Sequence, residues 1–277
     1  MMYYIVLPFG VILSLVFCWK RRLGYSVNNL IFKSVSSLCY LLTAVFALIS
    51  NPQAHTYGSL VIMGGALGLV GDILLDLKGI YKSEEKVYLK GGFIFFLIGH
   101  IFYFCAIIYS IKMKWWLVLI AAVVSAVIGI LTVLLANVMK VHYGAYRRIV
   151  AIYVAFLAMT SIISVIAVFA THFQKAYVIM AIGSILFLLS DAVLSNTFFG
   201  RGKDKPFHLF INHFLYYAGQ YLIAASLVHI EQVIFLLFVI SQFLQKFNAF
   251  IKSFITFLNS VFIYVVTNHI INHIFNS

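Results

Sequence analysis

Apolar runs of about 20 residues recur along almost the whole of this chain, and each is long enough to cross the hydrocarbon core of a bilayer as an α-helix. Hydrophobic residues make up 64% of the sequence, and charged residues only 9%. Transmembrane strands instead alternate apolar and polar residues over about 10 positions, a pattern that these continuous runs lack. The sequence therefore predicts an all-α, polytopic transmembrane helix bundle and excludes a soluble fold.

We expect eight core spans in one integral domain, because the connections are short and none is a Pro/Gly/Ser-rich linker. A transmembrane domain at 1–230 would be followed by a hydrophobic extension at 231–277, of undefined role, with apolar segments at about 232–250 and 253–271. The extension forms either a helical hairpin or a segment lying partly in the interface. The eight spans cover about residues 3–19, 29–49, 57–77, 91–111, 115–138, 148–171, 175–196 and 209–230.

The basic residues give the chain a formal net charge of +12 and gather in alternate connections. In a membrane protein this distribution indicates the orientation of the chain, because cytoplasmic loops carry an excess of Lys and Arg. The positive charge therefore does not require a nucleic-acid partner. We expect the N-terminus outside, basic loops in the cytoplasm and no nucleic-acid partner, in a bacterial inner membrane or a eukaryotic endomembrane. The basic residues after the first, third, fifth and seventh spans are Lys20, Arg21 and Arg22; Lys78, Lys82, Lys86 and Lys90; Lys140, Arg147 and Arg148; and Arg201, Lys203 and Lys205.

Two aspartates, Asp72 and Asp191, lie inside predicted spans. A carboxylate near the centre of a membrane helix costs roughly 2.5–3.5 kcal/mol on insertion scales, so it normally faces protein or water and has a functional role. Asp76, one turn beyond Asp72, is interpreted as a packing residue at the cytoplasmic interface. A structural alternative for Asp191 is a pair with Lys33, which enters the second span from the same side.

The two aspartates also suggest an internal duplication. Four helices in each half would form a parallel repeat and bring both acids to one leaflet near a pseudo-two-fold axis. The alternative is a chance alignment of apolar helices. Placing Asp72 over Asp191 also matches Gly64 with Gly183, Gly71 with Ser190, Leu75 with Leu194, and Gly99-His100 with Gly219-Gln220.

Polar side chains in the fourth and eighth spans are candidates for lining a cavity. His213, Tyr216 or Tyr217, and Gln220 follow helical spacing in the eighth span, and His100 and Tyr103 form a smaller stripe in the fourth. Each histidine could equally be a hydrogen-bonded core residue. Histidines and carboxylates with metal-ligand spacing are lacking, as are cofactor motifs, so we expect no metal and no cofactor. The three cysteines read as small core residues.

The motifs around these residues resemble, in order, those of the YhhN-like family of eight-helix membrane proteins, which includes the lysoplasmalogenases. The resemblance covers roughly residues 1–230 and places the family's two acids on Asp72 and Asp191, with matching residues at Lys33, His100, Tyr103 and Gln220. We expect these four, together with Tyr217, to bind the substrate. Ser34 and Gly219 depart from a common proline and alanine. The motifs are Gly71-Asp72-Ile73-Leu74-Leu75, Gly99-His100-Ile101-Phe102-Tyr103, Phe187-Leu188-Leu189-Ser190-Asp191 and Tyr216-Tyr217-Ala218-Gly219-Gln220-Tyr221-Leu222-Ile223.

The resemblance implies hydrolysis of the vinyl-ether bond of a lysoplasmalogen to a fatty aldehyde and a glycerophospho-ethanolamine or -choline. Such hydrolysis needs an acid, stabilisation of an oxocarbenium ion and a water, which is work that two carboxyl groups can share. The sequence does not decide which aspartate is the acid. The competing class is a proton-coupled transporter of a small molecule or lipid, because intramembrane acids also relay protons. A third is a lipid-binding or structural membrane protein. The oligomeric state stays open.

Overall fold

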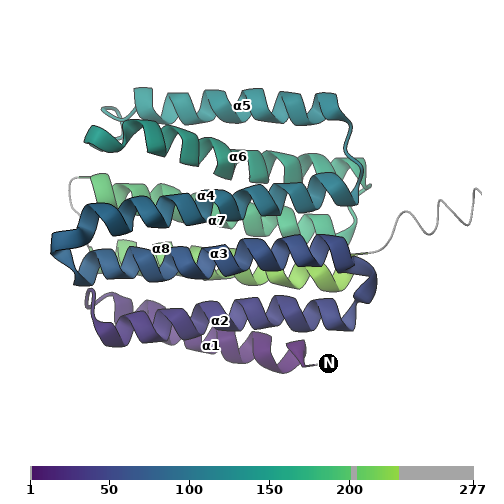
Figure 1. The fold of residues 1–277 in the computed structure, drawn as a ribbon, viewed down its shortest axis with the longest axis horizontal. Helices are drawn as coiled ribbons and strands as arrows, with labels where there is room; N and C mark the ends of the chain where they lie inside the picture. The colour runs from purple at the N-terminus through teal and green to yellow at the C-terminus, as the bar shows by residue number, and fades with distance from the viewer. Residues whose placement is uncertain (1, 201–204, 231–277) are drawn as a thin grey trace, which may run out of the picture. The chain divides into compact units, whose positions relative to one another are not determined.

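The computed structural model describes residues 2–200 and 205–230, which fold into eight α-helices that run up and down as one bundle (Figure 1). The predicted extension at 231–277, together with Arg201 and Lys203, lies outside the described residues. The helices are α1 (Tyr3–Arg21), α2 (Val27–Ser50), α3 (His55–Ile80), α4 (Glu85–Ser110), α5 (Trp115–Leu134), α6 (Arg147–Ala170), α7 (Lys175–Phe199) and α8 (Pro206–Ser226).

Seven of these helices, α1 to α7, are long and apolar enough to cross a membrane, as predicted for a multi-pass membrane protein. The eighth is long enough but less apolar, because it carries Asn212, His213, Gln220 and several tyrosines. The side chains of Asn212, His213 and Gln220 are all buried in the bundle. The polarity of α8 therefore belongs to the protein interior, where it does not have to be solvated by lipid.

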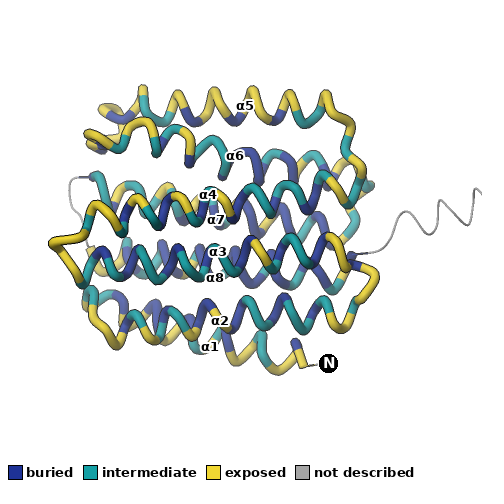
Figure 2. The backbone as a smooth tube through the Cα atoms, in the orientation of Figure 1, coloured by how far each residue is buried: buried dark blue, intermediate teal, exposed yellow. Residues whose placement is uncertain are grey.

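The helices form a central group flanked on both sides. In Figure 1, α3, α4, α7 and α8 lie between the pair α1 and α2 and the pair α5 and α6. The central helices and α6 of the flanking pair each carry many buried residues, whereas α5 is exposed along most of its length (Figure 2). Only small residues of α5 are buried, namely Ala121, Ser125 and Gly129, so its large apolar side chains form an outer surface suited to lipid.

The two halves of the bundle pack in corresponding ways, as the predicted repeat requires. Contacts of α1 with α2, α2 with α3 and α3 with α4 correspond to those of α5 with α6, α6 with α7 and α7 with α8. A Cβ added to Gly64 would lie 2.9 Å from the carbonyl oxygen of Gly99, and one added to Gly183 would lie 2.9 Å from that of Gly219. The glycines that the sequence alignment pairs thus allow the same close approach, of α3 to α4 and of α7 to α8.

Substitution of Gly183 by valine is expected to destabilise the bundle by about 1–3 kcal/mol, the usual cost of overpacking. An added Cβ would meet backbone atoms, the Gly219 oxygen at 2.9 Å and the Ile223 nitrogen at 3.1 Å, which cannot move aside as a side chain would. Thermal unfolding in detergent micelles should show a lower midpoint. Ala126→Val on the exposed face of α5 is the matched control, and equal midpoints for the two variants would contradict a tight α7–α8 contact.

Candidate functional site

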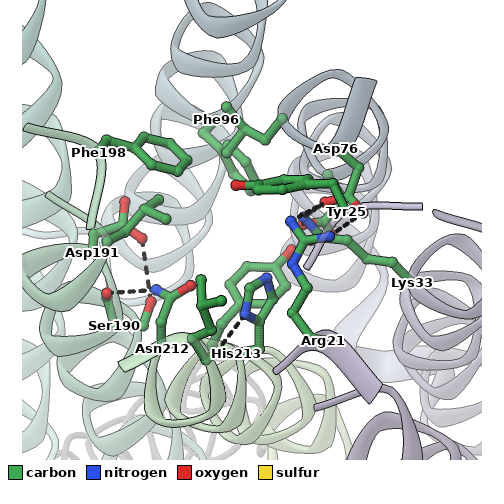
Figure 3. A pocket seen from close by; sticks show the side chains of 15 residues that line it. Arg21, Tyr25, Lys33, Asp76, Phe96, Ser190, Asp191, Phe198, Asn212 and His213 are labelled. Atoms are coloured by element: carbon green, nitrogen blue, oxygen red, sulfur yellow. Dashed lines mark hydrogen bonds and ion pairs between the residues drawn. The ribbon is translucent and has the colours of Figure 1, made fainter. Parts of the chain in front are cut away.

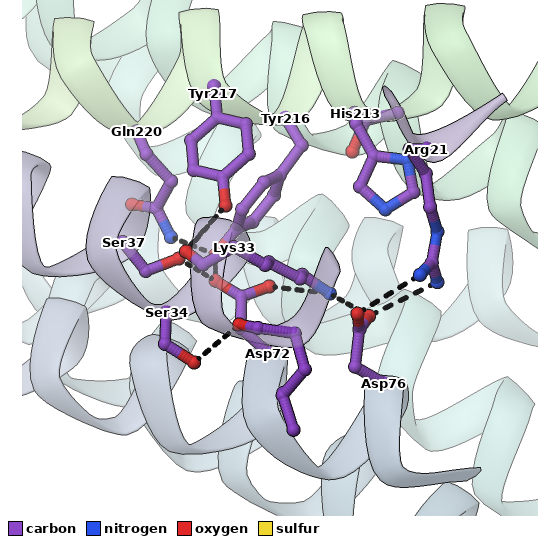
Figure 4. A network of polar contacts seen from close by, with 12 residues as sticks. Arg21, Lys33, Ser34, Ser37, Asp72, Asp76, His213, Tyr216, Tyr217 and Gln220 are labelled. Carbon is purple, nitrogen blue, oxygen red and sulfur yellow. Dashed lines mark hydrogen bonds and ion pairs between the residues drawn. The ribbon is translucent and has the colours of Figure 1, made fainter. Parts of the chain in front are cut away.

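Asp72 lies in a buried network of charges and hydroxyl groups between α1, α2, α3 and α8 (Figure 4). Its Oδ1 lies 3.2 Å from Lys33 Nζ, and its Oδ2 accepts hydrogen bonds from Ser37 Oγ and Tyr216 OH, each at 2.6 Å. Lys33 also reaches Asp76 at 3.1 Å. Arg21 completes the network with two hydrogen bonds to Asp76, at 3.0 and 3.1 Å. The two cations and two carboxylates are all buried, and their formal charges sum to zero.

Helical spacing accounts for this arrangement. Asp72 and Asp76 lie one turn apart on α3, and Lys33 and Ser37 lie one turn apart on α2, so each pair shares a face of its helix. Gly68, one turn before Asp72, allows the side chains of Gln220 and Tyr40 to approach within 3.2 Å of where its Cβ would be. The small residues of α3 thus let the other helices bring their polar groups to the acids.

Asp191 has different surroundings. Its carboxyl group accepts hydrogen bonds from Tyr153 OH on α6 and, at 3.2 Å, from Ser190 Oγ. Asn212 on α8 holds this turn of α7 by donating to the Ser190 carbonyl oxygen at 2.7 Å. Among the residues that the structure describes, no Lys or Arg lies within ion-pair distance of Asp191. Asp191 is therefore a hydrogen-bonded but unpaired acid.

Both aspartates line one small cavity, here called the polar cavity, between the two halves of the bundle (Figure 3). In this view Asp191, Ser190 and Asn212 lie on one side, and Arg21, Lys33 and Asp76 lie on the other. Tyr216 and Phe96 are also in the lining. The volume is about 30 Å³, enough for one or two waters, since about 10–15 Å³ accommodates one.

A second, larger cavity, here called the apolar cavity, lies between α5, α6 and α7. Its volume is about 400 Å³, and its lining is mostly aliphatic and aromatic, with Leu157, Leu188 and Phe199 among its residues. Among the described residues of this lining, Asp191 is the one acidic or basic side chain, and it is also part of the polar cavity. The carboxyl group of Asp191 thus lies between a polar cavity that is large enough for water and an apolar cavity. The volume of the apolar cavity falls within the range of roughly 300–1,000 Å³ that is typical of small-molecule sites.

Four of the predicted substrate-binding residues, His100, Tyr103, Tyr217 and Gln220, are not part of the lining of the polar cavity. Tyr103 donates to Gln220 Oε1 at 2.8 Å, and Gln220 Nε2 donates to Tyr216 OH at 3.3 Å, which extends the network from Asp72. Tyr217 OH donates to the Lys33 carbonyl oxygen at 3.1 Å. His100 Nδ1 lies 3.1 Å from Thr160 Oγ1 among aromatic side chains. Of the five, only Lys33 is among the residues that line the polar cavity.

Three interpretations drawn from the sequence need correction. Asp76 is not an interfacial packing residue: it is 0% exposed and paired with two cations, because a cavity-facing position is enclosed by α1 and α2. Arg21 is not a loop residue facing solvent but is buried at 2% exposure as the last residue of α1. The alternative pair of Lys33 with Asp191 does not form either, because Lys33 Nζ lies between Asp72 and Asp76.

Sequence reasoning missed Tyr153 and Ser37 and left Tyr216 undecided. Ser37 had a signal, since it follows Lys33 by one turn and precedes Tyr40 by three residues on the same face. Tyr153 had none, because its role depends on how α6 packs against α7. No group of three or more His, Cys, Asp or Glu side chains that could hold a metal ion occurs within residues 2–200 and 205–230.

The fold and the site together define a polytopic α-helical membrane protein with a buried acidic site between its two halves. The chain belongs to the YhhN family, whose family model matches residues 28–227. This match runs from the first turn of α2 to the end of the eight-helix bundle and includes both aspartates and Lys33; Arg21 lies outside it. No curated protein and no solved structure shows significant similarity to the chain.

Proposed function

We propose that this protein is a membrane-embedded hydrolase that cleaves the vinyl-ether bond of lysoplasmalogens to a fatty aldehyde and a glycerophospho-ethanolamine or -choline. Membership in the YhhN family, which the sequence motifs associate with lysoplasmalogenases, supports a membrane hydrolase. The observation that carries the specific reaction is the position of Asp191, which lines both the polar and the apolar cavity. Vinyl-ether hydrolysis needs such an acid, because its substrate is apolar and its co-substrate is water.

The two aspartates have different roles in this proposal. Asp72 is held as a carboxylate by Lys33 at 3.2 Å and by two hydroxyl donors at 2.6 Å. Among the described residues Asp191 has hydroxyl donors but no cationic partner, and apolar surroundings without a counter-charge favour an uncharged carboxyl group. Asp191 is therefore the proton donor, and Asp72 is the anion that stabilises positive charge developing across the polar cavity.

The reaction then follows in balanced steps. Asp191 transfers its proton to the alkenyl carbon that is not bonded to oxygen, which leaves positive charge shared between the ether oxygen and its neighbouring carbon. Water from the polar cavity adds to that carbon and gives a proton back to Asp191. The resulting hemiacetal breaks its bond to the glycerol oxygen, which takes up the hydroxyl proton, and the carbonyl compound released is the aldehyde. Glycosidases use a pair of acids for a similar oxocarbenium ion.

The purified protein is expected to release aldehyde from a lysoplasmalogen and no fatty acid from the ester-linked lysophospholipid with the same head group and chain length. The physical reason is that a vinyl ether is activated by protonation of carbon, whereas an ester needs a nucleophile and an oxyanion site. Both products are measured on each substrate. Fatty acid release would indicate a general lysophospholipase. Flux of a solute into proteoliposomes without any lipid product would instead favour the proton-coupled transporter.

A further inference from the structure

A third cavity, here called the loop cavity, adjoins the apolar cavity at the connection between α5 and α6. Its volume is about 290 Å³, and its lining includes Asn137, His142 and Arg147. Val141 and Tyr143 belong to the linings of both the loop cavity and the apolar cavity. The two spaces therefore share a wall, one side of which is polar and basic while the other is apolar.

The connection that forms the loop cavity is fixed to the end of α7. His142 N donates to the Phe199 carbonyl oxygen at 2.7 Å, and Val141 forms an isolated bridge with Gly200. Tyr143 OH lies 3.0 Å from Ser195 Oγ, a residue of the apolar cavity. These contacts hold the connection, which carries His142 and leads into Arg147, next to the turn of α7 that begins one turn beyond Asp191.

We infer that the loop cavity binds the phosphate of a single-chain phospholipid head group, with Arg147 as its principal cation, while the apolar cavity takes the glycerol-linked start of the chain and leads it to Asp191. This inference rests on the proposed function and names the site that its substrate would occupy. The polar end of a lysophospholipid is joined directly to an apolar chain, and the two cavities reproduce that order.

Charge complementarity favours Arg147 over the other cations near the site. Arg21 and Lys33 are already neutralised by Asp72 and Asp76, and the polar cavity that they line, at about 30 Å³, is too small for a head group. Among the residues that the structure describes, no Asp or Glu lines the loop cavity and Arg147 forms no ion pair. Arg147 thus offers a guanidinium that matches a phosphate and is not taken by a carboxylate.

Binding of a saturated 1-alkyl ether lysophospholipid, which lacks the cleavable double bond, tests this site on the full-length protein in detergent micelles. Arg147→Gln is expected to weaken its binding about tenfold, as loss of a charge-assisted hydrogen bond does. The same variant should bind the 1-alkyl glycerol of equal chain length, which has no phosphate, as the wild type does. Arg148→Gln is the matched control, because Arg148 is the next residue, is also exposed and does not line the loop cavity.

A second pair of variants tests the apolar cavity. Ala192→Trp adds a large side chain to this lining and is expected to weaken the binding of both ligands at least fivefold. Ala126→Trp, on the outer face of α5, should leave the binding of both ligands unchanged. Equal effects of Arg147→Gln and Arg148→Gln, or unchanged binding in Arg147→Gln, would overturn the head-group site. These ligands are not hydrolysed, so the binding result stands whether or not the wild type releases aldehyde from a lysoplasmalogen.

Discussion

Asp191→Asn is expected to reduce aldehyde release from lysoplasmalogen by about 10²–10⁴-fold, the range that a positioned general acid contributes. Asparagine keeps the size of the side chain and an oxygen that accepts the Tyr153 hydrogen bond, but it has no proton to give to carbon. The initial rate of aldehyde formation by purified variant and wild type measures the loss. Binding of the saturated ether analogue should be retained, because the amide leaves both the apolar cavity and the loop cavity intact.

Glu85→Gln is the matched control for this loss, since it also replaces a carboxyl group with an amide, at the start of α4 and outside the linings of the polar and apolar cavities. It should turn over substrate at the wild-type rate. Unfolding midpoints of both variants show whether inactivity reflects chemistry or loss of fold. Wild-type turnover by a folded Asp191→Asn protein would remove Asp191 as the proton donor.

Asp72→Asn should also abolish aldehyde release, but for another reason. An amide still accepts from Ser37 and Tyr216 yet carries no charge to stabilise the oxocarbenium ion or to balance Lys33. We therefore expect Asp72→Asn to be inactive and also to have a lower unfolding midpoint than Asp191→Asn. The reason is that Asp72 has a cationic partner, whereas Asp191 has none among the described residues. Turnover retained in both asparagine variants would end the two-aspartate mechanism.

The surroundings of the two aspartates show which features of the protein could be predicted from its sequence and which could not. Eight helices follow from local hydropathy, and their observed bounds mostly differ from the expected spans by a few residues; α4, which begins at Glu85, extends furthest beyond its span. Asp72 and Asp191 were identified because a carboxylate within an apolar run is itself unusual. Tyr153, in contrast, resembles many other tyrosines in membrane helices until α6 is packed against α7.

The burial of Arg21 could have been predicted from the sequence of α1. Within the basic run that ends α1, only helical phase distinguishes the buried arginine from Lys20 and Arg22. The buried residues Gly10, Ser14, Phe17 and Cys18 lie on one face, and Arg21 continues it one turn later. What phase could not give is the partner, because the contact with Asp76 joins residues 55 positions apart in the sequence.

Arg21→Met is expected to lower the free energy of unfolding by about 3–5 kcal/mol, the cost of removing one partner from a buried ion pair. Wild type has two cations and two carboxylates in this cluster, so the substitution leaves one negative charge unbalanced away from solvent. Denaturant titration in mixed micelles measures the change. Arg22→Met is the matched control, since Arg22 stacks on Trp19 and bonds the Trp19 carbonyl oxygen at the edge of the bundle.

The double variant Arg21→Met/Asp76→Asn decides whether net charge or packing explains that loss. Asp76→Asn alone leaves one positive charge unbalanced, whereas the double variant restores neutrality and keeps the pair of Lys33 with Asp72. If unbalanced buried charge dominates, the double variant should be more stable than either single variant, because hydrogen-bonded neutral groups cost less to bury than a lone ion. If the two losses simply add, the arginine stabilises α1 mainly through its packing, and the charge balance inferred for the cluster is wrong.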